Sequence, residues 1–169
     1  MEKIFITGMP GSGKTTLIKR IMEKTEDYLA IISEEIRKNG KRIGFFIELR
    51  DDKKIIEKEI LALDKVEEGN KYIKFGRYYV FPKNIDKIVD KAKLLIKEKE
   101  IIFIDEIGKM EFYSEKFKKF IEEILKSNIK IFATLHRDFI NKFKNYGNVL
   151  WLNKNNFNEI FEKIIKNIK

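Results

Sequence analysis

The chain has 169 residues, 43% of them hydrophobic and 37% charged, and its 36 basic and 27 acidic side chains give a net charge of +9. A chain of this length and apolar content can bury a core, which excludes intrinsic disorder and predicts a single domain over residues 1–169. The absence of cysteine excludes disulfides and Cys-ligated metal centres, and a single histidine excludes a His-rich metal site. Any metal bound here should therefore be a hard cation held by oxygen atoms.

The N-terminal part of the chain predicts strands around one helix. Residues 2–7 form a short apolar-rich strand, a glycine-rich turn follows, and apolar residues at helical spacing predict a helix from about Lys14 to Lys24. The segments 29–36 and 42–49 are β-like. Asn39-Gly40 between them is a strong hairpin signal, because a type I′ turn needs positive φ at both central residues.

The middle of the chain predicts an antiparallel insertion and then a return to helix and strand. Residues 54–63 and 71–81 indicate further strands, so roughly residues 33–81 form a β insertion. An apolar stripe predicts an amphipathic helix over Lys83–Lys99. Residues 100–105 (EIIFID) hold a continuous apolar run, as expected for a parallel strand that is covered on both faces.

The last part continues this alternation. The expected elements are a helix at about 114–126, a strand at 129–134, a short helix at 138–145, a strand at 148–152 and a helix at 156–168. Trp151 lies in the last of these strands and is expected in the core. Strands that alternate with helices predict an α/β fold, in which helices flank a parallel sheet and ligands gather at the carboxyl ends of its strands.

A glycine-rich motif falls at one such strand end. Residues 8–15 are GMPGSGKT, a full match to the Walker A phosphate-binding loop G-x-x-x-x-G-K-[ST], with a strand before it and a helix after it. The glycines let the backbone approach phosphate oxygens, and successive N–H groups at the helix N-terminus then converge on the phosphates. Lys14 is expected to bridge the β- and γ-phosphates, and Thr15 to offer its hydroxyl to Mg²⁺.

Two carboxylates end a second apolar strand. Residues 101–106 are IIFIDE, a pattern typical of the Walker B strand that holds Mg²⁺ in proteins with a phosphate-binding loop. Asp105 is expected to hold the metal, directly or through water. Glu106 comes one residue later, where a carboxylate can orient an attacking water and accept its proton. This residue favours hydrolysis over transfer to another acceptor.

Four segments together resemble a known family. GMPGSGKTT (8–16), IRKNGKRIGFFIEL (36–49), GRYYVF (76–81) and DEIGKME (105–111) are similar, in the same order, to the nucleoside-triphosphatase family first noted in thermophiles, which includes a human cancer-related member. The resemblance implies a RecA-like fold, in which another strand separates the acidic strand from the strand of the phosphate-binding loop. It also implies slow, broad hydrolysis of ATP, GTP, CTP and UTP to diphosphate and phosphate.

The resemblance carries a nucleotide site over by motif match. Its residues are Gly8, Met9, Pro10, Gly11, Ser12, Gly13, Lys14, Thr15, Ile101, Ile102, Phe103, Ile104, Asp105, Glu106, Ile107 and Gly108. One departure from the family pattern is Asn39-Gly40, where paired glycines are expected; this affects a turn and not the chemistry.

Phosphoryl transfer usually needs a further cation on the developing charge. The candidates are Arg37, Arg42, Arg77 and Arg137. Arg137 is the best placed of them, because it follows a strand that should end beside the site, and Arg42 could act from the insertion as a lid. Lys109 could also reach the phosphates, and Thr134 is a second sensor candidate. His136 has no obvious partner and is expected to be an ordinary loop residue.

The remaining expectations concern location and partners. No apolar run approaches the roughly 20 residues of a membrane span, and the N-terminus lacks the pattern of a signal peptide. We therefore expect a cytoplasmic monomer with no membrane partner. The positive charge is spread along the chain, as on a heat-adapted surface, and does not form a nucleic-acid-binding stripe. Two alternatives stay open: a nucleotide or small-metabolite kinase whose insertion binds the acceptor, and an ATPase stimulated by nucleic acid.

Overall fold

The computed structural model of the chain describes residues 2–168. Its strands are β1 (Lys3–Thr7), β2 (Leu29–Lys38), β3 (Lys41–Asp51), β4 (Lys54–Leu63), β5 (Ile73–Phe75), β6 (Tyr78–Val80), β7 (Ile101–Ile107), β8 (Lys130–Leu135) and β9 (Asn148–Trp151). Its α-helices are α1 (Lys14–Glu23), α2 (Pro82–Leu95), α3 (Glu115–Leu125), α4 (Ile140–Phe143) and α5 (Phe157–Ile168). Short 3₁₀ turns cover Ile96–Glu98, Glu111–Tyr113 and Arg137–Phe139.

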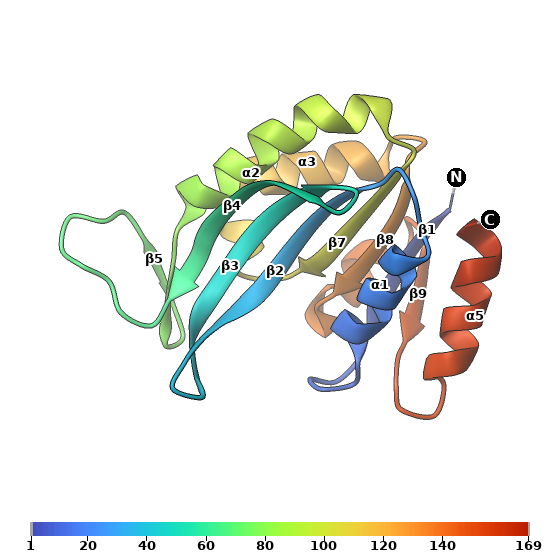
Figure 1. Cartoon of the computed structure of the whole chain (residues 1–169), viewed down its shortest axis with the longest axis horizontal. Helices are drawn as coiled ribbons and strands as arrows, with labels where there is room; N and C mark the ends of the chain where they lie inside the picture. The colour runs from blue at the N-terminus through green and yellow to red at the C-terminus, as the bar shows by residue number, and fades with distance from the viewer. Residues whose placement is uncertain (1, 169) are drawn as a thin grey trace.

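These strands form one nine-stranded sheet in the order β5-β6-β4-β3-β2-β7-β8-β1-β9 (Figure 1). The part from β2 to β9 is parallel, and the part from β2 to β5 is antiparallel. Strand β2 belongs to both, because its first residues pair with β7 while its whole length pairs with β3. The expected α/β fold with an antiparallel insertion is confirmed. So is the RecA-like order, since β8 lies between β7 and β1.

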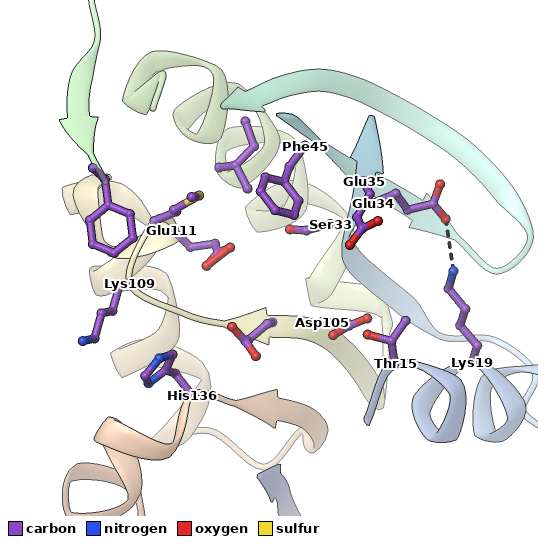
Figure 2. Close-up of a pocket in the computed structure, with 14 residues that line it drawn as sticks. Thr15, Lys19, Ser33, Glu34, Glu35, Phe45, Asp105, Lys109, Glu111 and His136 are labelled. Atoms are coloured by element: carbon purple, nitrogen blue, oxygen red, sulfur yellow. Dashed lines mark hydrogen bonds and ion pairs between the residues drawn. The ribbon is translucent and has the colours of Figure 1, made fainter. Parts of the chain in front are cut away.

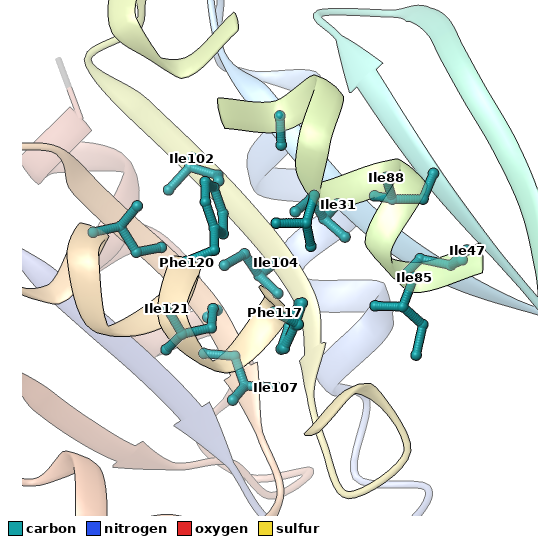
Figure 3. Close-up of a cluster of buried hydrophobic side chains, with 14 of the residues drawn as sticks. Ile31, Ile47, Ile85, Ile88, Ile102, Ile104, Ile107, Phe117, Phe120 and Ile121 are labelled. Carbon is teal, nitrogen blue, oxygen red and sulfur yellow. The ribbon is translucent and has the colours of Figure 1, made fainter. Parts of the chain in front are cut away.

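Helices cover both faces of the parallel part (Figure 1). Helices α1 and α5 pack on one face, and α2 and α3 pack on the other. Strand β7 supplies both cores by alternation: Ile102 and Ile104 point to the α2–α3 side (Figure 3), and Phe103 points to the α1–α5 side. All three side chains are fully buried, and each such burial stabilises the fold by roughly 1.5–3 kcal/mol. The cores hold β7 firmly, so its carboxyl end is well positioned for chemistry.

Local signals in the sequence have their expected structural effects. Asn39 and Gly40 both have positive φ, 51° and 77°, and join β2 to β3 in a tight hairpin. Ser114 caps α3, because its side chain accepts a hydrogen bond from the Phe117 amide at 3.1 Å. No helix among residues 2–168 is both long enough and apolar enough to cross a membrane.

Three expectations need correction. Strands β2 and β3 extend further than expected, to Lys38 and Asp51, because they pair along almost their full length. The helix expected at 138–145 is reduced to a 3₁₀ turn and the short α4. The prediction that Trp151 is a core residue is wrong: its side chain is 46% exposed. Strand β9 lies at the edge of the sheet, so its neighbours cannot enclose a side chain of this size.

Gly44 marks a close approach between two strands of the insertion. A Cβ atom added there would lie 2.2 Å from the backbone carbonyl oxygen of Ala62 on β4. No side-chain rotation can relieve a contact with backbone, so we expect Gly44→Ala to lower the free energy of unfolding by about 2 kcal/mol or more in chemical denaturation. Gly76→Ala, with open space around its Cβ and a φ of 60°, should cost only about 1 kcal/mol. Equal losses would contradict this account.

Candidate active site

The loop between β1 and α1 has the geometry of an anion-binding cradle. Gly13 precedes the helix with a φ of 98°, a left-handed conformation that glycine adopts without strain. A Cβ atom on Gly8 would lie 2.7 Å from the carbonyl oxygen of Leu152, so this position also requires glycine. Helix α1 has no acidic residue in its first turn and no side-chain cap. Its first N–H groups are therefore available to a phosphate.

Two polar groups in this loop lack an ordinary structural role. Lys14 extends back across the loop, and its Nζ donates a hydrogen bond to the Gly8 carbonyl oxygen at 3.0 Å. The Ser12 hydroxyl is buried and has no hydrogen-bond partner among residues 2–168. A buried polar group without a partner is costly unless a ligand satisfies it. Both groups therefore fit a site that receives phosphate oxygens.

Asp105 lies near the carboxyl end of β7, close to the first turn of α1. Its Oδ1 accepts a hydrogen bond of 2.6 Å from the Thr134 hydroxyl on β8, the neighbouring strand. Burial raises the pKa of Asp105, and the Thr134 hydroxyl and the nearby Thr15 hydroxyl oppose this rise. Figure 2 shows the side chains of Thr15 and Asp105 turned toward each other. Together they present hard oxygen donors, the set that Mg²⁺ prefers.

Glu106 follows Asp105 and is half-buried. Burial raises the pKa of Glu106; the positive charge of Lys14 lowers it, and the negative charge of Asp105 adds to the rise. A raised pKa makes the ionised carboxylate a better proton acceptor near neutral pH. Glu106 is therefore suited to general-base chemistry.

These groups open into a cavity of about 670 Å³ (Figure 2). Thr15, Asp105 and Glu106 form one wall. A second wall comes from the antiparallel part of the sheet, and its residues are Ser33, Glu34, Glu35, Phe45, Leu61 and Phe75. The sequence did not identify this wall, because strand pairing alone brings its residues together. The cavity thus connects the phosphate-binding loop and the end of β7 with the insertion.

The structure separates the residues that the motif match had grouped. Ile101, Ile102, Phe103 and Ile104 pack in the two cores and do not line the cavity, so they support the strand and do not face a ligand. Met9, Pro10 and Gly11 form the exposed tip of the loop. Ile107 is buried, and Gly108 lies directly beside the Glu106 carboxyl.

The cationic candidates differ in their surroundings. Arg137 is exposed in the turn after β8 and is not among the residues that line the cavity. Lys109 lines the cavity and pairs with Asp138 at 2.6 Å, and His136 lines it as well. Burial lowers the pKa of His136, so its ring is mostly neutral at pH 7.

The three candidate arginines of the insertion share two hydrogen-bond acceptors, Glu35 and Tyr78. Arg42 donates to the Tyr78 hydroxyl at 2.8 Å and to Glu35 at 3.2 Å. Arg37 donates to Glu35 at 2.9 Å, and Arg77 donates to the Tyr78 hydroxyl at 2.6 Å. These contacts hold the β2–β3 hairpin against β6. None of the three lines the cavity.

Comparisons with known proteins agree with this geometry. A family model described as NTPase matches residues 3–165. The nucleoside-triphosphatase THEP1 of Methanocaldococcus jannaschii is 43% identical over 98% of this chain and 96% of its own length. The protein of the same name from Pyrococcus abyssi is 38% identical over 99% of this chain and 92% of its own length.

Solved structures give the same result. The crystal structure of THEP1 from the hyperthermophile Aquifex aeolicus matches with a TM-score of 0.78 at 30% identity, covering 99% of both chains. The solution structure of a human cancer-related nucleoside triphosphatase matches with a TM-score of 0.74 at 25% identity, covering 100% of this chain and 98% of that one. With the phosphate-binding loop, the acidic strand and nearly the whole chain matched, this protein belongs to the NTPase family.

Proposed function

We propose that this chain hydrolyses nucleoside 5′-triphosphates to the diphosphate and phosphate, with Mg²⁺ as cofactor and little selectivity for the base. The observation that carries the proposal is the position of Glu106. Glu106 lines the same cavity as Thr15 and Asp105, and the charge of Lys14 in the phosphate-binding loop acts on its carboxyl. A base at this point can activate a water for attack on a terminal phosphate.

Substrate binding begins at the loop 8–15. The free N–H groups of α1 and the loop, the Ser12 hydroxyl and the Lys14 ammonium group all offer hydrogen bonds to the phosphates. Lys14 must leave the Gly8 carbonyl to do so, and a charged phosphate is a stronger acceptor than a neutral carbonyl. The loop therefore binds the substrate through its phosphate groups, which every nucleoside triphosphate has.

Thr15 and Asp105 fit the expected Mg²⁺. Both supply oxygen donors, both line the cavity, and their side chains lie near each other in Figure 2. When bound, the cation neutralises charge on the β- and γ-phosphates. Its pull on Asp105 also favours the ionised carboxylate, which burial alone disfavours.

Glu106 carries out the proton transfer in this scheme. Its carboxylate orients a water in the cavity and accepts a proton as the water oxygen bonds to the γ-phosphorus. The bond from the γ-phosphorus to the bridging oxygen breaks, and the diphosphate leaves with that oxygen. Lys14 stabilises the charge that develops there. Arg137 is the further cation we propose, since its turn follows β8, the strand beside β7, and its exposed side chain is free to swing.

Broad base selectivity is the expected consequence of this arrangement. The groups that act in this scheme, in the loop 8–15 and at the end of β7, are directed at phosphates, metal or water, which every nucleoside triphosphate offers. The relatives from Methanocaldococcus jannaschii and Pyrococcus abyssi are named nucleoside-triphosphatases, a name that specifies no single base. This agreement supports the proposal.

A phosphate-release panel tests the proposed function. With Mg²⁺ present, ATP, GTP, CTP and UTP should all yield phosphate, with kcat/KM values within about tenfold of one another, since a hydrophobic or hydrogen-bonded base pocket would be needed for larger ratios. Removal of divalent cations with EDTA should abolish release, and Mg²⁺ should restore it. Hydrolysis of one nucleotide alone, or an unchanged rate in EDTA, would contradict the proposal.

The cavity makes phosphoryl transfer the second candidate. It extends from Glu106 to Phe45, Leu61 and Phe75, which is more space than an attacking water needs. Glu34 and Glu35 on its wall oppose an anionic acceptor such as a second nucleotide. In the same panel, diphosphate formed in excess of free phosphate when a neutral or cationic alcohol is added would favour a kinase.

A further inference from the structure

A buried carboxyl group adjoins the site outside both phosphate-binding motifs. Glu111 begins the turn after β7, and its side chain is only 6% exposed. Within residues 2–168 it has no ion pair, whereas Glu48, another buried glutamate, pairs with Arg50 at 2.8 Å. An unpaired buried acid is costly, and an apolar residue of similar size would commonly be more stable. Its presence therefore suggests a role other than packing.

The contacts of Glu111 converge on one peptide unit. Its Oε2 accepts a hydrogen bond from the Gly108 amide at 3.1 Å. A Cβ atom added to Gly108 would lie 2.8 Å from this same Oε2 and 2.7 Å from Oε1 of Glu106. Both carboxyl groups therefore lie close to the Gly108 Cα, in space that only glycine leaves open. Figure 2 shows the Glu111 carboxyl directed into the cavity.

The charge state of Glu111 suits a contact with a second acid. Burial, and next the negative charge of Glu106, raise the pKa of Glu111 to about 8, so its carboxyl is neutral at pH 7. A neutral carboxyl can accept from the Gly108 amide and direct its own hydroxyl at a carboxylate. The other ionisable groups around the cavity are Lys19, Glu34, Glu35, Asp105, Lys109 and His136.

We propose that Glu111 is a positioning residue for Glu106. It fixes the 106–108 turn through the Gly108 amide and holds the Glu106 carboxylate against the cavity, where it meets the attacking water. The proposal rests on the proposed function, because it gives Glu106 its role as base. In this role Glu111 does not bind the nucleotide, so substitution of Glu111 should change kcat and leave nucleotide affinity unchanged.

Three substitutions test this role. Glu111→Gln keeps a neutral side chain that accepts from the Gly108 amide, and kcat at pH 7 should stay within about threefold of wild type. Glu111→Leu has a side chain of similar volume but removes the acceptor of the Gly108 amide. Gly108→Ala adds a methyl group that would clash with the Glu106 and Glu111 carboxyl oxygens. Each should lower kcat by about 100-fold, the expected effect of a misplacement of about 1 Å, with KM and nucleotide affinity within threefold.

Further readouts separate positioning from folding. Thermal unfolding should show Glu111→Leu folded, with a loss of no more than about 3 kcal/mol from the Gly108 amide that loses its acceptor. Glu48→Gln, which alters the ion-paired buried glutamate, should lower stability and leave kcat of the folded protein unchanged. As Glu111 ionises, wild-type kcat should fall above about pH 8, and Glu111→Gln should lack this fall.

The outcomes distinguish the possible failures. If Glu106→Gln is impaired and folded Glu111→Leu is as active as wild type, the positioning role is wrong and the proposed function stands. If Glu111→Gln is as inactive as Glu111→Leu, Glu111 transfers protons itself, and positioning is again wrong. If Glu106→Gln is as active as wild type, Glu106 is not the base, so the positioning role of Glu111 fails while hydrolysis of the nucleotide still stands.

Discussion

Replacing Glu106 with glutamine should lower the rate of phosphate release by about 10³-fold, within the range that a positioned general base contributes. Glutamine has nearly the same shape as glutamate but cannot accept the proton of the attacking water. Glu106 does not belong to the phosphate-binding loop, and the N–H groups of α1 and the Lys14 ammonium group are unchanged in this variant. Nucleotide affinity should therefore stay within about threefold of wild type.

Single-turnover phosphate release and equilibrium binding of a fluorescent triphosphate analogue measure the two effects separately. Glu100→Gln is the matched control, because Glu100 is an exposed glutamate just before β7, at the opposite end of the strand from the site. Its rate and affinity should equal those of wild type. Lys14→Ala provides the contrast, since it should lose affinity as well as rate. A Glu106→Gln variant with the full rate of release would show that the base lies elsewhere.

The sequence could predict the parts of the site that depend on neighbouring residues. The loop 8–15 needs glycines at fixed spacing and a helix that starts at Lys14, and the structure has both. The buried strand β7 could be predicted equally well, because a continuous apolar run is typical of a parallel strand that is covered on both faces. Periodicity alone did not predict the strand order: the separation of β7 from β1 was expected only through the family resemblance.

The second wall of the cavity, from the antiparallel part of the sheet, could not be predicted in this way. Ser33, Phe45, Leu61 and Phe75 come from four different strands, and only the register of the antiparallel pairs brings them to one surface. The prediction that Trp151 is buried was wrong for a related reason. An apolar strand at the edge of a sheet has the same local pattern as one in its centre, so burial depends on neighbours that the pattern does not reveal.

Glu111 was within a motif that the sequence analysis quoted, yet its burial was not predicted. A glutamate is almost never fully buried unless it is paired. It is enclosed here because the turn after β7 folds back toward the strand end, which brings its carboxyl to the Gly108 amide. Of the segment 101–108, only Asp105 and Glu106 line the cavity. A motif match therefore gives the segment of a site, and the fold decides which side chains face it.

The buried carboxyl of Glu111 should make this protein lose stability as pH rises from about 5 to 8. Its pKa is about 8 in the folded chain, while an unfolded glutamate titrates near 4.3. Between these values the folded state binds one more proton than the unfolded state, so the free energy of unfolding falls with increasing pH. The full effect is at most about 5 kcal/mol, and water in the cavity will reduce it.

Glu111→Gln isolates this contribution, because it removes the titrating group and leaves every other ionisable residue in place. The difference in free energy of unfolding between the variant and wild type should be small at pH 5 and should grow in favour of the variant up to about pH 8.5. Guanidinium denaturation of both proteins at several pH values measures it. If the two stability curves ran parallel over this range, Glu111 would have to be ionised throughout. A charged group would then lie beside Glu106 at neutral pH, and the neutral carboxyl that positions the proposed base would not exist.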